Sequence, residues 1–187
     1  MSRRYKFKNP QGVYFITFAT VEWVDVFIRK EYREIVIDSL KHCQENKGLE
    51  IFAWCLMTNH IHLIAKASQK QTLPDILRDF KGFTAKQILK AIKENPRKTR
   101  KSSMLEQFEK AGLKTSNVKK YQFWQHDNHP IELWSNHIID QKLNYIHQNP
   151  VKANLTAHAE DYPFSSAIDY AGGIGELSVT LIAKNDF

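Results

Sequence analysis

The sequence predicts an α+β fold of the ferredoxin-like kind, a split βαβ arrangement with helices on one face of an antiparallel sheet. Three observations lead to this prediction. Segments with strand and helix patterns follow one another in the order strand, helix, strand, strand, helix, strand, helix. The two central strands are joined at Thr58 and Asn59, a hairpin spacing. A chain of 187 residues, 42% of them hydrophobic, suits a single domain with a sizeable core.

The first strand and the first helix have clear boundaries. The stretch "GVYFITFATV", residues 12–21, is rich in β-branched and aromatic residues and follows Asn-Pro-Gln-Gly, which favours a strand after a turn. Residues 29–48 carry apolar side chains at helical spacing and end in Gly48, which is typical of a helix C-cap.

The hairpin and the second helix follow directly. The runs "EIFAWCLMT" and "HIHLIAKA" are both apolar and strand-like, and Asn59 between them tolerates the positive φ that a tight turn demands. Residues 72–95 are expected to form a helix, with Thr72 as N-cap and Pro74 in the first turn. The sheet is then covered by helices on one face, and the other face stays free for a ligand.

The second half of the chain is less regular. Residues 96–120 are polar and basic with one short amphipathic piece, which indicates either an insertion or a flexible arm. Residues 121–133 are expected to add a strand, with the aromatic side chains mainly in the core. Residues 134–150 predict a third helix, capped by Ser135 and stopped at Pro150. We expect one domain over 1–187, with a basic insertion at about 95–120 and a C-terminal tail from about 156.

Charge and cysteines limit the classes of function. The net charge is +7 and the pI about 9.3, which favours a polyanionic partner, although a solvated basic surface would look the same. The excess is concentrated between Lys90 and Lys120. No apolar run approaches the roughly 18 residues needed to cross a bilayer, so no membrane role is expected. Cys43 and Cys55 are expected to be buried thiols in a reducing compartment.

Two histidines interrupt the second hairpin strand. Residues i and i+2 of a strand point to the same side, so His60 and His62 should project together while Ile61 faces the core. The pair alone is a weak signal, because a turn residue and a half-exposed strand residue need no ligand. If they hold a metal, two imidazoles are too few for a closed structural site, and the site would be open and catalytic.

The third helix offers the groups that such a site would lack. Tyr145 and Asn149 stand four residues apart and therefore share one helix face. That face can deliver a phenol oxygen and an amide oxygen to one point over the histidines. An ordinary buried tyrosine and a helix-ending asparagine remain the simpler interpretations. The tryptophans Trp124 and Trp134 are expected in the core.

Two long motifs in this order resemble a known family. "CLMTNHIHLIA", followed by "LNYIHQNPVKANL" and "DYPFSSAIDYAG", is similar to the single-tyrosine HUH transposases of bacterial insertion sequences, and closest to the REP-associated tyrosine transposases. The chain departs from that pattern where Thr58 replaces proline, where Asn154 replaces glycine, and in a longer basic segment. None of these departures touches the histidines, the tyrosine or Asn149.

The resemblance implies metal-dependent, site-specific cleavage and rejoining of single-stranded, hairpin-bearing DNA. Tyr145 would attack a phosphodiester and form a 5′-phosphotyrosine intermediate. His60, His62 and Asn149 would hold Mg²⁺ or Mn²⁺. It also implies a bacterial, cytoplasmic, nucleoid-associated protein, with a monomer favoured over a homodimer. The basic side chains expected to contact the DNA are Arg3, Arg4, Arg78, Lys81, Lys86, Arg97, Lys98, Arg100 and Lys101.

Two alternatives stay open. A domesticated relative could bind structured nucleic acid without cutting it, although such a protein has no need of His60, His62 and Tyr145 together. A metal-dependent phosphoesterase could use activated water instead, and Tyr145 would then be dispensable.

Overall fold

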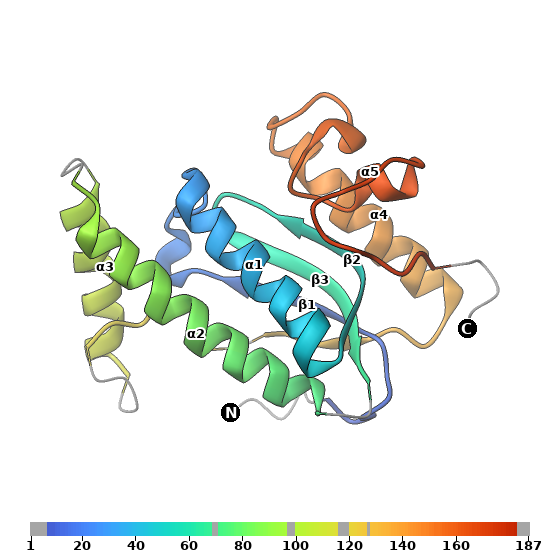
Figure 1. The fold of residues 1–187 in the computed structure, drawn as a ribbon, viewed down its shortest axis with the longest axis horizontal. Coiled ribbons are helices and arrows are strands. Elements are labelled where there is room, and N and C mark those ends of the chain that lie inside the picture. Colours follow the sequence, from blue (N-terminus) through green and yellow to red (C-terminus); the bar gives the residue numbers. More distant parts are fainter. Residues whose placement is uncertain (1–6, 69–70, 97–99, 116–119, 127, 183–187) are drawn as a thin grey trace.

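The computed structural model describes residues 7–68, 71–96, 100–115, 120–126 and 128–182. Its centre is a four-stranded antiparallel sheet in the order β2-β3-β1-β4 (Figure 1). The strands are β1 (Tyr14–Ala19), β2 (Leu49–Leu56), β3 (His60–Ala67) and β4 (Ile131–Glu132). With α1 (Lys30–Lys47) after β1 and α2 (Leu73–Glu94) after β3, this is the split βαβ order, and the predicted α+β fold is confirmed.

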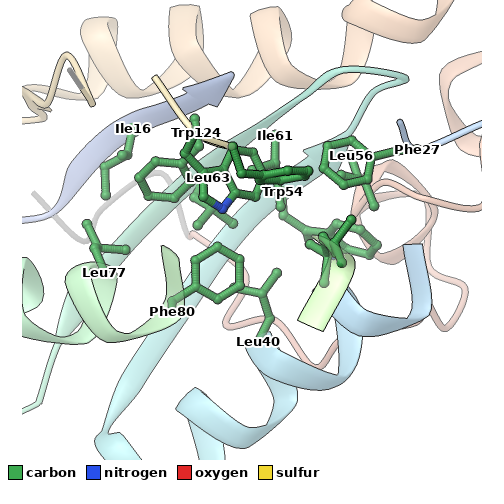
Figure 2. Packing of buried hydrophobic residues seen from close by; sticks show 14 of the residues in the cluster. Ile16, Phe27, Leu40, Trp54, Leu56, Ile61, Leu63, Leu77, Phe80 and Trp124 are labelled. Atoms are coloured by element: carbon green, nitrogen blue, oxygen red, sulfur yellow. The ribbon is translucent and has the colours of Figure 1, made fainter. Parts of the chain in front are cut away.

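Helices α1 and α2 cover one face of the sheet and enclose the main core. Figure 2 shows Leu40 of α1 and Phe80 of α2 pointing at strand residues that include Ile61 and Leu63 of β3. Each such side chain stabilises the fold by roughly 1.5–3 kcal/mol when it leaves water. The predicted caps of both helices are present. Thr72 accepts a hydrogen bond from the Asp75 amide, and Gly48 ends α1 at a φ of 75°.

The opposite face of the sheet is not free. Helix α4 (Asn136–Lys152) lies against it, and its Ile139 and Ile146 pack onto a second apolar cluster with Phe15 of β1 and Ile64 of β3. The sheet is therefore sandwiched between two helical layers, and α4 is the layer on the side of the two histidines.

The predicted end of α4 at Pro150 is wrong by two residues. Pro150 lies buried inside the last turn, where its missing N–H costs one hydrogen bond while the neighbouring bonds persist. The helix closes through the Leu155 amide, which donates to the Pro150 carbonyl at 2.9 Å, and Asn154 takes a φ of 54°. Asparagine tolerates this left-handed conformation, which explains how it can stand where the related motif has glycine.

The basic segment after α2 is packed where the structure describes it. Helix α3 (Lys101–Leu113) buries Met104 and Phe108 in the main core, so this part of the segment is not a flexible arm. The strand expected over residues 121–133 is reduced to β4 and an isolated bridge between Thr20 and Trp124. Phe123 and Trp124 are buried, and backbone hydrogen bonds from the Val21 amide to the Phe123 carbonyl and from the Gln125 amide to the Ala19 carbonyl hold this segment beside β1.

The C-terminal tail runs along the outer edge of β2. After the 3₁₀ turn η2 (Ala159–Asp161), the Leu56 amide donates to the Phe164 carbonyl at 2.8 Å and the Ser166 amide to the Trp54 carbonyl at 3.0 Å. The short helix α5 (Ala167–Tyr170) follows, and the Tyr170 hydroxyl donates to the Phe52 carbonyl. In the part of the chain that the structure describes, no helix is both long and apolar enough to span a membrane.

Candidate active site

Strand β3 places both histidines on the α4 side of the sheet. Ile61 between them is fully buried on the α1–α2 side, as strand alternation predicts. The Nε2 atoms of His60 and His62 lie 3.1 Å apart, and the ring centroids 4.7 Å apart. The two Nε2 atoms therefore lie side by side, within hydrogen-bonding distance of each other.

The other ring nitrogens are each held by a hydrogen-bonding partner. His60 Nδ1 lies 2.7 Å from the side-chain oxygen of Asn59, and His62 Nδ1 lies 2.8 Å from the hydroxyl of Thr17. The Asn59 amide is oriented because its Nδ2 donates to the Trp23 carbonyl and to Asp25 Oδ1. His60 must then donate from Nδ1, which leaves the lone pair on Nε2.

Asn59 does not serve the turn as expected from sequence. It has no positive φ; the backbone turn closes instead through the Met57 amide and the His60 carbonyl, 2.8 Å apart. Its side chain is the important part, because it hydrogen-bonds both to the loop that carries Trp23 and Asp25 and to His60.

Burial keeps both imidazoles neutral. It lowers the pKa of His60 to about 4, and it lowers the pKa of His62 to about 3 with smaller contributions from His60 and Lys142. At neutral pH neither ring carries a charge, which is the state that binds a cation.

Helix α4 brings Tyr145 against the histidine pair. The Tyr145 ring centroid lies 5.2 Å from that of His62 and 5.8 Å from that of Phe15. Phe15 in turn stacks on His62. The Tyr145 side chain is 40% exposed, so a large substrate can reach it.

Asn149 lies one turn beyond Tyr145 on the same face of α4. Its Nδ2 donates to the Tyr145 carbonyl at 2.7 Å, so the amide oxygen is the atom remaining for a ligand. Among the described residues there is no cluster of three or more His, Cys, Asp or Glu that could hold a metal ion. A cation here would depend on two imidazoles and a neutral oxygen donor.

A lysine that the sequence motifs did not indicate lies beside the tyrosine. Lys142 Nζ lies 4.9 Å from the ring centroid of Phe15 and 5.7 Å from that of Tyr145. Its position three residues before Tyr145, on the same helix face, was the signal that could have revealed it.

The exposed tryptophans were also not foreseen. Trp124 is buried as predicted, but Trp134 is 74% exposed, because it precedes the N-cap of α4 and points away from both clusters. Trp23 is 54% exposed, and its ring centroid lies 5.5 Å from that of His60.

The predicted DNA-binding side chains on α2 belong to the helical layer on the sheet face opposite the histidines. Arg78 forms ion pairs with Asp75 and Asp79, and Lys81 donates to the Asn128 side chain at 2.7 Å. Lys86 is exposed.

The remaining predicted DNA contacts are near α3 or outside the described residues. Arg100 donates to the Asp25 carbonyl at 3.4 Å, and Lys101 donates to the carbonyls of Lys93 and Asn95 at the end of α2. Four further predicted residues lie outside the part of the chain that the structure describes: Arg3, Arg4, Arg97 and Lys98.

The family model described as "Transposase IS200 like" matches residues 12–149, a span that begins before β1 and ends at Asn149. The chain belongs to this family. It is therefore a DNA transposase, as the resemblance of its motifs indicates. The two histidines and Tyr145 all fall inside the matched region.

Two curated relatives agree with this assignment. The chain is 25% identical over 187 residues to the REP-associated tyrosine transposase of Escherichia coli (strain K12), covering 94% of this chain and 93% of that protein. It is 32% identical over 54 residues to the ISDra2 transposase TnpA of Deinococcus radiodurans, covering 29% of this chain and 39% of that protein.

A solved structure shows the same fold. The structure of a REP-associated tyrosine transposase bound to a REP hairpin superimposes with a TM-score of 0.62 at 19% identity, covering 100% of this chain and 98% of that one. The match extends over the C-terminal tail, which the family model does not include.

Proposed function

We propose that this transposase cuts and rejoins single-stranded, hairpin-bearing DNA through a 5′-phosphotyrosine on Tyr145, with a divalent cation held by His60, His62 and Asn149. The observation that carries the proposal is the approach of the Tyr145 ring to His62, whose Nε2 faces that of His60. Tyr145 of α4 thus lies beside the two neutral imidazoles of β3. Asn149, one turn further along α4, is the oxygen donor that we assign to the same site.

The donor set fits a divalent cation. Each imidazole has its Nδ1 held by an oxygen, an arrangement that commonly orients metal-ligating histidines. Imidazole and amide donors with open positions suit Mg²⁺ or Mn²⁺, and the imidazoles favour Mn²⁺. When bound, the cation would supply positive charge to a non-bridging oxygen of the scissile phosphate.

The chemical step assigned to Tyr145 balances without an outside energy source. The phenol loses its proton and its oxygen bonds to phosphorus, while the bond from phosphorus to the 3′-oxygen breaks and that oxygen takes up a proton. The reverse attack by a 3′-hydroxyl, from the same or another strand, releases Tyr145 and rejoins the DNA.

Two observations support a hairpin DNA substrate: the position of Lys142 and the DNA bound by a relative. The ammonium group of Lys142 above Phe15 and Tyr145 is placed to contact a phosphate beside the nucleophile. The solved relative holds a REP hairpin, and we assign this chain to the same class of DNA. Lys86 and Arg100 remain proposed backbone contacts, as do Arg3, Arg4, Arg97 and Lys98.

We infer that one chain can assemble the site by itself. Tyr145 and His62 of the same molecule are in ring contact, which supports a monomer as the active form, as favoured from sequence. A protein that processes chromosomal hairpins would work at the nucleoid.

A covalent-capture experiment tests the function. The protein is incubated with Mn²⁺ or Mg²⁺ and a pool of labelled single strands, each with a hairpin stem and a randomised unpaired flank. We expect a protein–DNA adduct that survives denaturing electrophoresis and disappears in Tyr145→Phe. Tyr121→Phe, which changes a tyrosine that packs against Lys93 and Lys120 on the other side of the sheet, is the matched control and should retain the adduct.

The same experiment separates the alternatives. Cleavage without an adduct, unchanged in Tyr145→Phe, would identify a phosphoesterase that uses water. Retention of the hairpin strands without cleavage under either metal would identify a binding module.

A further inference from the structure

A short loop after β1 presents an exposed indole beside the histidines. The 3₁₀ turn η1 (Val21–Trp23) ends in Trp23, whose ring meets that of His60 edge to face at 79°. More than half of the Trp23 side chain remains exposed. Tryptophan is highly buried on average, so an exposed indole in contact with His60 indicates a role at the surface.

The backbone of this loop is strained. Glu22 and Trp23 have φ angles of 51° and 53°, two consecutive non-glycine residues in the left-handed region. A bulky side chain rarely adopts this conformation, and such strain gathers at functional sites. Because the indole is largely exposed, its packing contributes little stability to offset this backbone strain.

The loop is nevertheless held firmly in place. The Trp23 amide donates to the Thr20 carbonyl at 3.2 Å, and the Trp23 carbonyl accepts from Asn59 Nδ2 at 3.2 Å. The same Asn59 side chain accepts from His60 at 2.7 Å. One amide therefore ties the Trp23 backbone to the His60 imidazole, and the indole itself meets that imidazole edge to face.

We propose that Trp23 is a stacking site for one unpaired nucleobase next to the scissile phosphate. The inference rests on the proposed function, because it assumes that the DNA strand binds next to the histidine pair. A phosphate held there brings its neighbouring nucleotide into the range of an indole 5.5 Å from His60. Aromatic side chains hold unpaired bases in this way regardless of base identity, because every base has a π-face.

Fluorescence of a base analogue tests the stacking directly. Hairpin strands with 2-aminopurine at each unpaired position in turn are bound to Tyr145→Phe protein, which cannot form the adduct. We expect quenching at one flanking position. It should be lost when Trp23→Ala is added, with roughly tenfold weaker binding, and largely kept with Trp23→Phe, which retains an aromatic ring.

Trp134→Ala is the matched control, because Trp134 is more exposed than Trp23 and precedes α4, which begins at Asn136, nine residues or roughly 14 Å along the helix axis from Tyr145. It should leave the quenching unchanged. Quenching that persists in Trp23→Ala, that is absent at every position, or that falls equally in Trp134→Ala overturns the stacking site. Thermal melting of Trp23→Phe and Trp23→Ala confirms that both are folded.

Adduct formation by the otherwise unchanged protein on the same strands reports separately on the proposed function. An adduct with no Trp23-dependent quenching refutes only the stacking site. Absence of an adduct refutes the function itself.

Discussion

Thr17 and His62 are directly opposed in the pairing of β1 with β3, and the Thr17 hydroxyl lies 2.8 Å from His62 Nδ1. If a cation occupies the site, His62 would donate this hydrogen bond from Nδ1 and keep the lone pair on Nε2 for the cation. The sheet register thus orients a proposed metal ligand through a residue on a different strand.

Removing that hydroxyl should weaken the metal site. In Thr17→Val the side chain keeps its shape but His62 loses its partner, and we expect a 10- to 100-fold loss of Mn²⁺ affinity, measured by calorimetry. Thr17→Ser keeps a hydroxyl and should stay close to the unchanged protein. Equal affinities in Thr17→Val and Thr17→Ser would show that this hydrogen bond does not orient a ligand.

Asp25 should act on His60 through Asn59. Asp25 Oδ1 accepts from Asn59 Nδ2 at 3.0 Å and from the Thr58 hydroxyl at 2.7 Å. Asp25→Ala leaves the Asn59 Nδ2 group with the Trp23 carbonyl as its acceptor, so the amide is oriented less firmly, and we expect adduct formation to need about tenfold more Mn²⁺. Asp25→Asn retains an oxygen acceptor and should need much less additional metal. If both variants need the same increase in Mn²⁺ concentration, the charge of the Asp25 carboxylate, and not its hydrogen bond to Asn59, is what matters.

Because the backbone of Asn154 is left-handed, substitutions at this position should change the stability of the protein. Asn154→Ala places an alanine at a φ of 54° and should lower the free energy of unfolding by about 1 kcal/mol, whereas Asn154→Gly should be close to neutral. Denaturant titration measures both. The same change at Asn144, within α4, should instead raise stability by a few tenths of a kcal/mol, because alanine is the better helix former.

The hydroxyl of Ser166 should stabilise the contact between the tail and α4. It lies 2.9 Å from His147 Nε2 and accepts from the Trp54 amide at 3.0 Å, both partly or fully buried. Ser166→Ala leaves these groups without that partner, and we expect a loss of about 1–3 kcal/mol in the free energy of unfolding. Ser178→Ala, at an exposed position further along the tail, is the control and should change stability by less than about 0.5 kcal/mol.

Both thiols should be unreactive in the folded protein. Burial raises the pKa of Cys43, and it raises the pKa of Cys55 to about 12, so little thiolate is present near neutral pH. Iodoacetamide at pH 8 should leave both unmodified by mass spectrometry until denaturant is added. Rapid labelling of either thiol in the native state would contradict this burial.

Local patterns predicted much of the architecture. Alternation along β3 correctly separated Ile61 from the two histidines, and the caps at Gly48, Thr72 and Ser135 were recognised because each depends on a residue type at a fixed place. The relation of Tyr145 to Asn149 followed from helix geometry alone.

The errors have a common physical origin in tertiary contacts. Pro150 was expected to stop α4, but the buried last turn tolerates the lost hydrogen bond. Asn59 was expected to supply an unusual backbone angle, while its side chain makes the important contacts. The partners of the histidines, Thr17 and Asp25, are distant in sequence, and no periodicity within one segment connects them.

The tail along β2 has a consequence for incomplete copies of the chain. Carbonyl and amide groups of Trp54 and Leu56 are paired by Phe164 and Ser166, so this edge of the sheet is closed by the chain itself. A product that ends before Phe164 would retain both histidines and Tyr145 yet expose an unpaired strand edge, which invites pairing with other molecules. We expect such truncated copies to aggregate, and a damaged gene would then leave no partial enzyme free to act on DNA.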